Sequence, residues 1–348
     1  MTPEKAQKIQ RIIKDRPHVV ILGAGATVAS IPNGDKHGKK SSVMSGFIDK
    51  LYMREIIESI NLNTASDNLE DIYTELHERN DCDDVREELD TRIRRYFESL
   101  EIPDSPNIYD FLLLSLRPKD LIATFNWDPL LLQAYQRVCR ITRSLPKLAF
   151  LHGNVLVGAC ENHKYGGITS AQCPECGEYF KAGKLLYPIR HKDYVSDPYI
   201  ADHWKMIGQA LKRAYLVTIF GYSAPKTDAE AIELMKKAWG ESHNRELEDF
   251  EFIDIQPENA LVESWDDFIH SHHYQVFNNF FKSSLSRFPR RTTVELFDRT
   301  MECKFTEPTL VFDENMSWDD IERTVNSLVA EEEALGENEY LSVAGVSA

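Results

Sequence analysis

The sequence predicts an α/β fold built on a doubly wound, mostly parallel sheet. Five short segments are apolar throughout, and segments with helical spacing of apolar residues separate them. A strand that is buried on both faces is a continuous apolar run, whereas a half-exposed strand alternates apolar and polar residues. The predicted strands are residues 18–22, 120–125, 145–153, 214–220 and 250–255. Because helices connect most of them, we expect a parallel sheet with helices on both faces.

The predicted elements follow in a regular order along the chain. Pro17 ends an N-terminal helix, and the valines and the isoleucine of residues 18–22 favour a strand that Gly23 terminates. Pro129 is tolerated in the first turn of the helix after the second strand. The predicted helices are residues 4–15, 43–60, 67–100 (one helix or two), 107–116, 129–140, 199–212 and 227–239. Beyond residue 256 the weaker pattern predicts two helices and a short strand near 309–312.

The chain of 348 residues is acidic, with a formal net charge of −16. Such a charge makes the chain a poor candidate for sequence-independent binding to nucleic-acid phosphates, which needs clustered cations. The acidity lies in two stretches. Residues 67–101 hold 13 acidic and 5 basic residues, and residues 311–348 hold 10 acidic residues and one arginine. The remaining chain, which contains the motifs described below, is therefore close to neutral.

Other features of the sequence indicate the cellular setting. No apolar run approaches the roughly 18 residues that a membrane span requires. Residues 1–17 are too highly charged for a signal peptide. Six cysteines in a chain of this length do not form a disulfide scaffold. We therefore expect a cytoplasmic protein that binds neither a membrane nor nucleic acid directly.

A glycine-containing turn follows the first predicted strand. Gly23 and Gly25 stand in the segment ILGAGAT, where glycine lets the backbone turn tightly and approach a diphosphate. The dinucleotide-binding fingerprint has a third glycine three residues after the second, and Val28 occupies that position here. The motif alone therefore leaves two interpretations open, a diphosphate-binding turn or a tight turn without a ligand.

Polar residues follow the next two predicted strands. The segment ATFNWDP places Thr124, Asn126 and Asp128 at one strand end, and LHG places His152 at the next. Open α/β sheets bind ligands at the carboxyl ends of their strands. An asparagine that orients a nucleophile and a histidine that accepts a proton form a plausible pair for hydrolysis or group transfer. The alternatives are that Asn126 and Asp128 cap a helix and that His152 is a core histidine.

A cysteine-rich segment interrupts the α/β pattern at residues 160–186. Cys160 and His163 form one pair of soft ligands, and Cys173 and Cys176 form a second. Two such pairs suit tetrahedral zinc, whose structural sites have four N or S donors. The sequence therefore predicts a small zinc-binding module, the alternative being four unrelated residues in a surface loop.

Taken in order, these motifs resemble the sirtuin family over residues 17–256. The shared features are the GAG turn with Thr27, an Ile-Pro pair (Ile31 and Pro32), T-x-N-x-D, L-H-G, the cysteine-rich insertion and the later G-Y-S. The resemblance implies a Rossmann-like sheet of sirtuin type with a small zinc-binding insertion and a helical insertion. It also implies that NAD binds in the crevice and that its bond to nicotinamide is cleaved.

The resemblance assigns a role to each matching residue. Asn126 would position the attacking group near C1′ of the ribose, Asp128 would hold the loop of Asn126, and His152 would be the general base. The implied NAD-binding residues are Gly23, Ala24, Gly25, Thr27, Thr124, Gly221, Ser223 and Asp254. The implied zinc ligands are Cys160, His163, Cys173 and Cys176.

The sequence departs from sirtuin deacylases at two places. Residues 184–198 lack the Phe-Gly-Glu segment that pairs with an acyl-lysine peptide, and Asn33, Gly34 and Asp35 replace an arginine after the Ile-Pro pair. Both absences argue against peptide binding. They fit the sirtuin-like proteins of bacterial antiviral defence, which hydrolyse NAD outright. The alternatives are a deacylase with an unusual substrate segment and a catalytically silent sensor of NAD or ADP-ribose.

Several further expectations follow from this interpretation. Residues 1–256 form the catalytic domain, and residues 257–348 form an acidic extension for interaction or oligomerisation. Since NAD depletion is toxic, we expect a homo-oligomer or a second defence-system protein that senses infection. The basic residues 190–192 are either a solvated turn or a contact to cofactor phosphates or a partner, and those in 288–293 form a surface patch.

Overall fold

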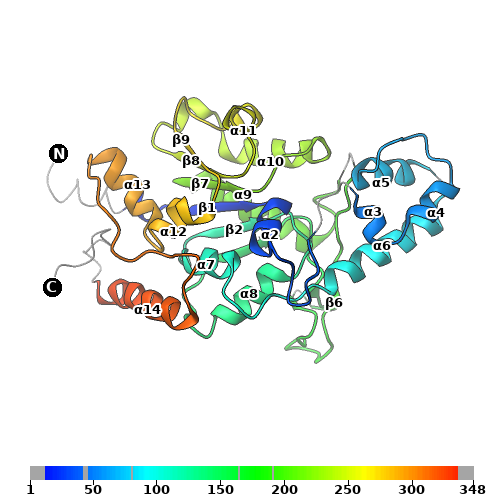
Figure 1. The fold of residues 1–348 in the computed structure, drawn as a ribbon, viewed down its shortest axis with the longest axis horizontal. Coiled ribbons are helices and arrows are strands. Elements are labelled where there is room, and N and C mark those ends of the chain that lie inside the picture. Colours follow the sequence, from blue (N-terminus) through cyan, green and yellow to red (C-terminus); the bar gives the residue numbers. More distant parts are fainter. Residues whose placement is uncertain (1–11, 42–45, 80, 164, 190–191, 336–348) are drawn as a thin grey trace.

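The computed structural model describes residues 12–41, 46–79, 81–163, 165–189 and 192–335 (Figure 1). A six-stranded sheet forms its centre, and every neighbouring pair of strands is parallel. The strand order is β3-β2-β1-β7-β8-β9. The strands are β1 (His18–Leu22), β2 (Leu121–Thr124), β3 (Lys147–Phe150), β7 (Leu216–Phe220), β8 (Asp249–Ile253) and β9 (Tyr274–Phe277). The predicted doubly wound α/β class is confirmed.

The sheet is buried on both faces, as its continuous apolar strands predict. In β1, Val20 and Leu22 belong to one core, and Val19 and Ile21 belong to the other, because successive side chains point to opposite faces. The first core is covered by α2 (Ala24–Ser30), α7 (Ile108–Leu114) and α8 (Leu130–Val138). The second core is covered by α9 (Pro198–Arg213), α10 (Ala229–Trp239) and α11 (Glu258–Trp265).

The sheet continues beyond residue 256, where we expected the catalytic domain to end. β9 pairs with β8 in parallel and forms the edge of the sheet, so residues 257–348 contribute a strand to the main domain. Residues 309–312, which are all described, form no strand. The strand expected near residues 309–312 is therefore wrong. β9 was not predicted because it is a short, half-buried edge strand without a continuous apolar run.

Two insertions leave the sheet. The acidic stretch 67–101 forms two helices, α5 (Leu69–Glu78) and α6 (Asp83–Glu98), which pack with α3 (Phe47–Lys50) and α4 (Arg54–Ser59) at one end of the molecule (Figure 1). The predicted helix 43–60 is thus two short helices. The cysteine-rich insertion forms a separate antiparallel sheet of order β5-β4-β6. Its strands are β4 (Val157–Ala159), β5 (Gly166–Ile168) and β6 (Lys181–Ala182).

The C-terminal helices pack onto the main domain through buried arginines. The C-terminal helices are α12 (Ser284–Arg287), α13 (Thr292–Met301) and α14 (Trp318–Ala334). Three short 3-10 helices lie earlier in the chain, η1 (Lys226–Asp228), η2 (Ser242–Asn244) and η3 (Phe280–Lys282). The expected basic surface patch at 288–293 is wrong, because Arg290 and Arg291 are 1% and 3% exposed. Both pair with Glu332 of α14. Among the described residues, no helix combines the length and apolarity of a membrane span.

We expect Glu332→Ala to lower the free energy of unfolding by roughly 2–4 kcal/mol, because it leaves a buried guanidinium without its carboxylate. Glu333→Ala is the matched control, since Glu333 is an exposed residue of the same helix. Denaturant unfolding of the two variants measures the difference. Equal stabilities would contradict a structural role for the pair between Glu332 and Arg290.

Candidate active site at the carboxyl ends of the strands

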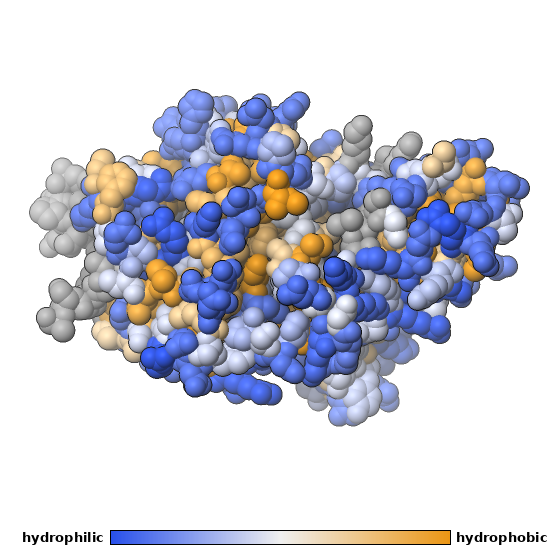
Figure 2. All heavy atoms as spheres, viewed as in Figure 1, coloured by the Kyte–Doolittle hydropathy of each residue, from blue (hydrophilic) through white to orange (hydrophobic). Residues whose placement is uncertain are grey.

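A cavity of about 1020 Å³ opens at the carboxyl ends of β1, β7 and β8. This is the point where the strand order reverses direction, and open α/β sheets bind ligands there. Gly25, Gly221 and Asp254 line it, together with apolar residues such as Ile31 and Phe281. On the face shown in Figure 2, hydrophobic residues gather near the middle, within a mostly hydrophilic surface.

Three glycines bring the ends of β1 and β7 into direct backbone contact. The N–H of Gly25 donates to the carbonyl oxygen of Gly221 at 2.9 Å. A Cβ on Gly25 would lie 2.7 Å from the Cα of Gly221, and a Cβ on Gly23 would lie 2.5 Å from the carbonyl oxygen of Gly221. Gly221 itself has a φ of +59°. Glycine is therefore required here by close approach of the two backbones, whether or not a ligand is bound.

We expect Gly221→Ala to destabilise the protein by about 3 kcal/mol or more, because it adds a clash to an unfavourable backbone conformation. Its Cβ would lie 2.3 Å from the backbone nitrogen of Ala26. Gly240→Ala is the matched control, because Gly240 also has a positive φ but its Cβ would meet nothing within 4 Å. The control should cost about 1 kcal/mol. Similar thermal stabilities of both variants would contradict the proposed packing constraint.

The side chain of Asn126 is held in one orientation. Its Nδ2 donates to the carbonyl oxygen of Gly23 at 2.8 Å and to Oγ1 of Thr27 at 3.0 Å. Its backbone N–H donates to Oγ1 of Thr124. Since both hydrogens of the amide point at protein acceptors, Oδ1 is the atom that is left to contact a ligand. Asn126 thus presents a hydrogen-bond acceptor beside the glycine turn.

A buried network supports this asparagine. The hydroxyl of Thr27 donates to Oδ2 of Asp128 at 2.7 Å and lies 2.8 Å from the hydroxyl of Tyr109. Oδ1 of Asp128 accepts from the N–H of Leu130 at the start of α8. Burial raises the pKa of Asp128 and raises that of Tyr109 well above its usual value. Asp128 therefore links Thr27 to the first residue of α8, whose N-cap is Pro129.

His152 follows β3 and is 5% exposed. Its ring lies 4.8 Å from the ring of Phe125 and stacks on Tyr194 at 6.0 Å between centroids. Its Nε2 lies 3.7 Å from Oδ1 of Asp228 and has no hydrogen-bond partner among the described residues. Burial lowers the pKa of His152 to about 4, so the imidazole is neutral near pH 7. A neutral imidazole is able to accept a proton.

The expected NAD-binding residues differ in whether they line the cavity. Gly25, Gly221 and Asp254 line the cavity, Ala24 is half-buried beside it, and Ser223 is exposed. Thr27 and Thr124 are buried and contact protein groups, so they position Asn126 and do not line the cavity. Gly23 is also buried, and its carbonyl oxygen accepts from Nδ2 of Asn126. Neither Asn126 nor His152 is itself a lining residue.

Four residues around these side chains were missed by the sequence-based prediction. They are Tyr109, Lys192, Tyr194 and Asp228. Lys192 was expected in a solvated turn or at cofactor phosphates or a partner, but it is buried and its Nζ lies 2.5 Å from Oδ1 of Asp228. The segment GYSAPKTD offered one signal, since its final aspartate precedes α10. Arg190 and His191 lie outside the described residues.

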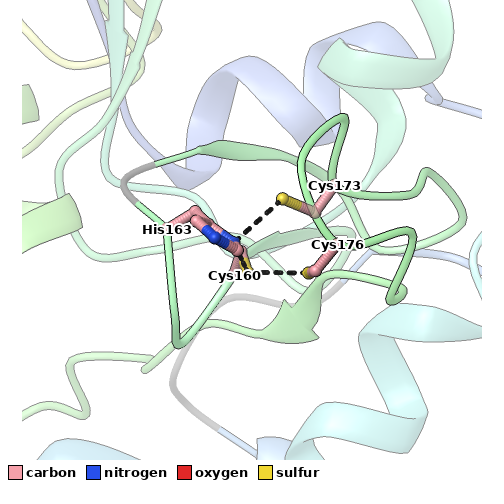
Figure 3. A group of neighbouring side chains, drawn as sticks. All are labelled: Cys160, His163, Cys173 and Cys176. Atoms are coloured by element: carbon pink, nitrogen blue, oxygen red, sulfur yellow. Dashed lines mark hydrogen bonds between the residues drawn. The ribbon is translucent and has the colours of Figure 1, made fainter.

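The cysteine-rich insertion brings its four predicted ligands together (Figure 3). Their ligand atoms all lie within 4.8 Å of one another. The Sγ of Cys160 lies 3.5 Å from Nδ1 of His163 and 3.6 Å from Sγ of Cys176, and Cys173 lies 3.6 Å from the same Nδ1. A tetrahedral zinc with these donors has edges of about 3.5–3.8 Å. The four side chains therefore could hold a metal ion.

We expect the purified protein to contain one zinc ion per chain, and we expect Cys173→Ser to lose most of it, because serine is a poor zinc ligand. The matched control is Cys303→Ser, since Cys303 is an exposed cysteine outside the group. Elemental analysis after gel filtration measures the metal content. Equal zinc content in both variants would contradict the assignment of these ligands.

The chain matches no described family model, and it has no significant match among curated proteins. Solved structures similar to it include a Sir2 homologue in complex with ADP-ribose, with 14% identity, a TM-score of 0.35 and coverage of 95% of this chain and 98% of that chain. A structure described under the mechanism and regulation of Sir2 enzymes has 15% identity, a TM-score of 0.39 and coverage of 95% and 100%. A Sir2 homologue in complex with NAD has 13% identity, a TM-score of 0.33 and coverage of 93% and 94%.

Proposed function

We propose that this protein is a sirtuin-like NAD glycohydrolase, which cleaves NAD to nicotinamide and ADP-ribose. The observation that supports the proposal is that Asn126 follows β2 and donates to the carbonyl oxygen of Gly23 in the glycine turn, while His152 follows the neighbouring strand β3. The cavity at the carboxyl ends of β1, β7 and β8 has a volume of about 1020 Å³, near the upper end of the range for small-molecule sites. Asp254 at the end of β8 offers a carboxylate to a ribose hydroxyl.

In the proposed reaction, the bond between C1′ of the ribose and the pyridinium nitrogen breaks, and its electron pair goes to that nitrogen. Nicotinamide therefore leaves as a neutral molecule. Oδ1 of Asn126 accepts a hydrogen bond from the attacking water, whose oxygen forms the new bond to C1′. The neutral imidazole of His152 takes up the proton that the water loses. Asp128 and Thr27 keep the amide of Asn126 in position.

The surroundings of His152 favour water over an acyl-lysine peptide as the second reactant. Tyr194, from the segment that replaces the peptide-binding motif, stacks on the imidazole. The N–H of Leu186 donates to the carbonyl oxygen of His152 at 2.9 Å. A peptide strand beside His152 would have to displace this part of the chain. Hydrolysis needs space for one water molecule only.

Two further parts of the proposal concern zinc and biology. The ion would be structural, because Cys160, His163, Cys173 and Cys176 supply four donors and leave no open position. From the sequence resemblance, we also propose that the protein is the effector of a bacterial anti-phage system that acts by abortive infection. Its toxicity would require control in the cytoplasm by homo-oligomerisation or by a partner that senses infection.

The proposed activity is tested by incubating the full-length protein with NAD, with and without an acetyl-lysine peptide, and following nicotinamide and ADP-ribose. Release without peptide supports the hydrolase. Release that depends on the peptide would overturn it in favour of a deacylase, and binding without turnover would favour a sensor.

We expect Asn126→Ala and His152→Ala each to reduce nicotinamide release by about 10²-fold or more, because they remove the group that orients water and the group that accepts its proton. His272→Ala is the control, since His272 is exposed and lies outside the site. Initial rates at saturating NAD measure the effect. Unchanged rates in both site variants would show that the site is wrongly assigned.

A further inference from the structure

Asp228 is a buried carboxylate at the start of α10, and it lies at the centre of a group of polar side chains around His152. Its Oδ2 accepts from the hydroxyl of Tyr222 at 2.9 Å. Its Oδ1 accepts from Nζ of Lys192 at 2.5 Å. The same Oδ1 lies 3.7 Å from Nε2 of His152. One carboxylate oxygen therefore faces both a buried ammonium group and the imidazole.

This arrangement differs from an ordinary structural ion pair. The Nζ of Lys192 also donates to the carbonyl oxygen of Thr227 at 2.9 Å, so the lysine is fixed beside the carboxylate. Nε2 of His152, in contrast, is buried and has no hydrogen-bond partner among the described residues. A buried nitrogen without a partner is costly, and a catalytic role is one physical explanation for such an atom. The carboxylate that lies closest to this nitrogen is that of Asp228.

Taking the proposed function as given, we propose that Asp228 and Lys192 are positioning residues that set the basicity of His152 in opposite directions. Asp228 stabilises the imidazolium that forms when His152 takes up a proton at the ring. Lys192 binds the same carboxylate oxygen and reduces that stabilisation. The pair thus keeps His152 neutral before the reaction and still supports its charge afterwards.

The charges around His152 are consistent with this division of roles. Burial lowers the pKa of His152 most strongly, the negative charge of Asp228 raises it, and the positive charge of Lys192 lowers it again. The pKa values of Tyr194 and Tyr222 are raised, so both phenols are neutral near pH 7. Two carboxylates lie farther out. Glu70 of α5 accepts a hydrogen bond from Thr227, and the negative charge of Glu230 in α10 helps to raise the pKa of Tyr194.

The experiment compares Asp228→Asn, Lys192→Met and the double variant in the full-length protein. The ring signals of histidine are followed by NMR as a function of pH, and the signal of His152 is assigned by its loss in His152→Asn. We expect Asp228→Asn to lower the titration midpoint of His152 and Lys192→Met to raise it, each by roughly one pH unit or more. The double variant should return toward the original value, because both charges are removed.

Matched controls are Lys14→Met and Asp298→Asn, which remove the partners of another buried pair, with Nζ and Oδ1 2.8 Å apart. They should leave the midpoint of His152 unchanged. If Asp228→Asn does not fold, Lys192→Met alone still tests the proposal, because loss of the neighbouring positive charge should raise the titration midpoint of His152. The acid limb of the rate profile for nicotinamide release should move to higher pH in this variant.

Shifts of both single variants in the same direction, or no shift in Lys192→Met, would overturn the proposal. Failure of the proposed function has a different signature. In that case the unmodified protein releases no nicotinamide, whereas the NMR midpoints of His152 still move in opposite directions. The two results are therefore distinguishable in one set of samples.

Discussion

The contact between the backbones of Gly25 and Gly221 determines the geometry of the site. It joins the ends of β1 and β7, from which α2 and α10 pass to opposite faces of the sheet. A side chain at either position would force the two strand ends apart, because its Cβ would lie 2.7 Å or less from a backbone atom of the facing segment. The same contact leaves the carbonyl group of Gly23 available to the amide of Asn126. The orientation of the proposed water-binding group therefore depends on a packing constraint that needs no ligand.

The central fold could be predicted because its strands are buried on both faces. Continuous apolar runs identified five of the six strands, and the spacing of apolar residues identified the helices between them. β9 was missed because an edge strand with half-buried side chains lacks this signal. Arg290 and Arg291 were misplaced for another reason. A buried arginine is tolerated when a carboxylate meets it, and the carboxylate of Glu332 comes from a helix about 40 positions later. Composition within a short segment cannot reveal such a partner.

The candidate site was predictable where polar residues or glycines follow a strand, and not where burial decides the role of a side chain. Asn126, His152 and the glycines stand at strand ends in the sequence pattern. Thr27 was expected to bind NAD, and its hydroxyl group forms hydrogen bonds with Asn126 and Asp128 within the protein. Lys192 looks like a surface residue until Asp228, 36 positions away, is placed beside it. Such side chains are specified by contacts that exist only after folding.

The acidic residues behind the net charge of −16 therefore have more than one structural role. Part of the acidity of α14 is internal, since Glu331 and Glu332 neutralise arginines that would otherwise be buried charges. In the acidic helical insertion, Glu70 accepts a hydrogen bond from Thr227, next to Asp228. Burial raises the pKa of Glu70, which indicates a partly desolvated carboxylate. Acidic residues in both stretches therefore help to hold the fold and the surroundings of His152. A partner-binding role can involve only the carboxylates that remain exposed.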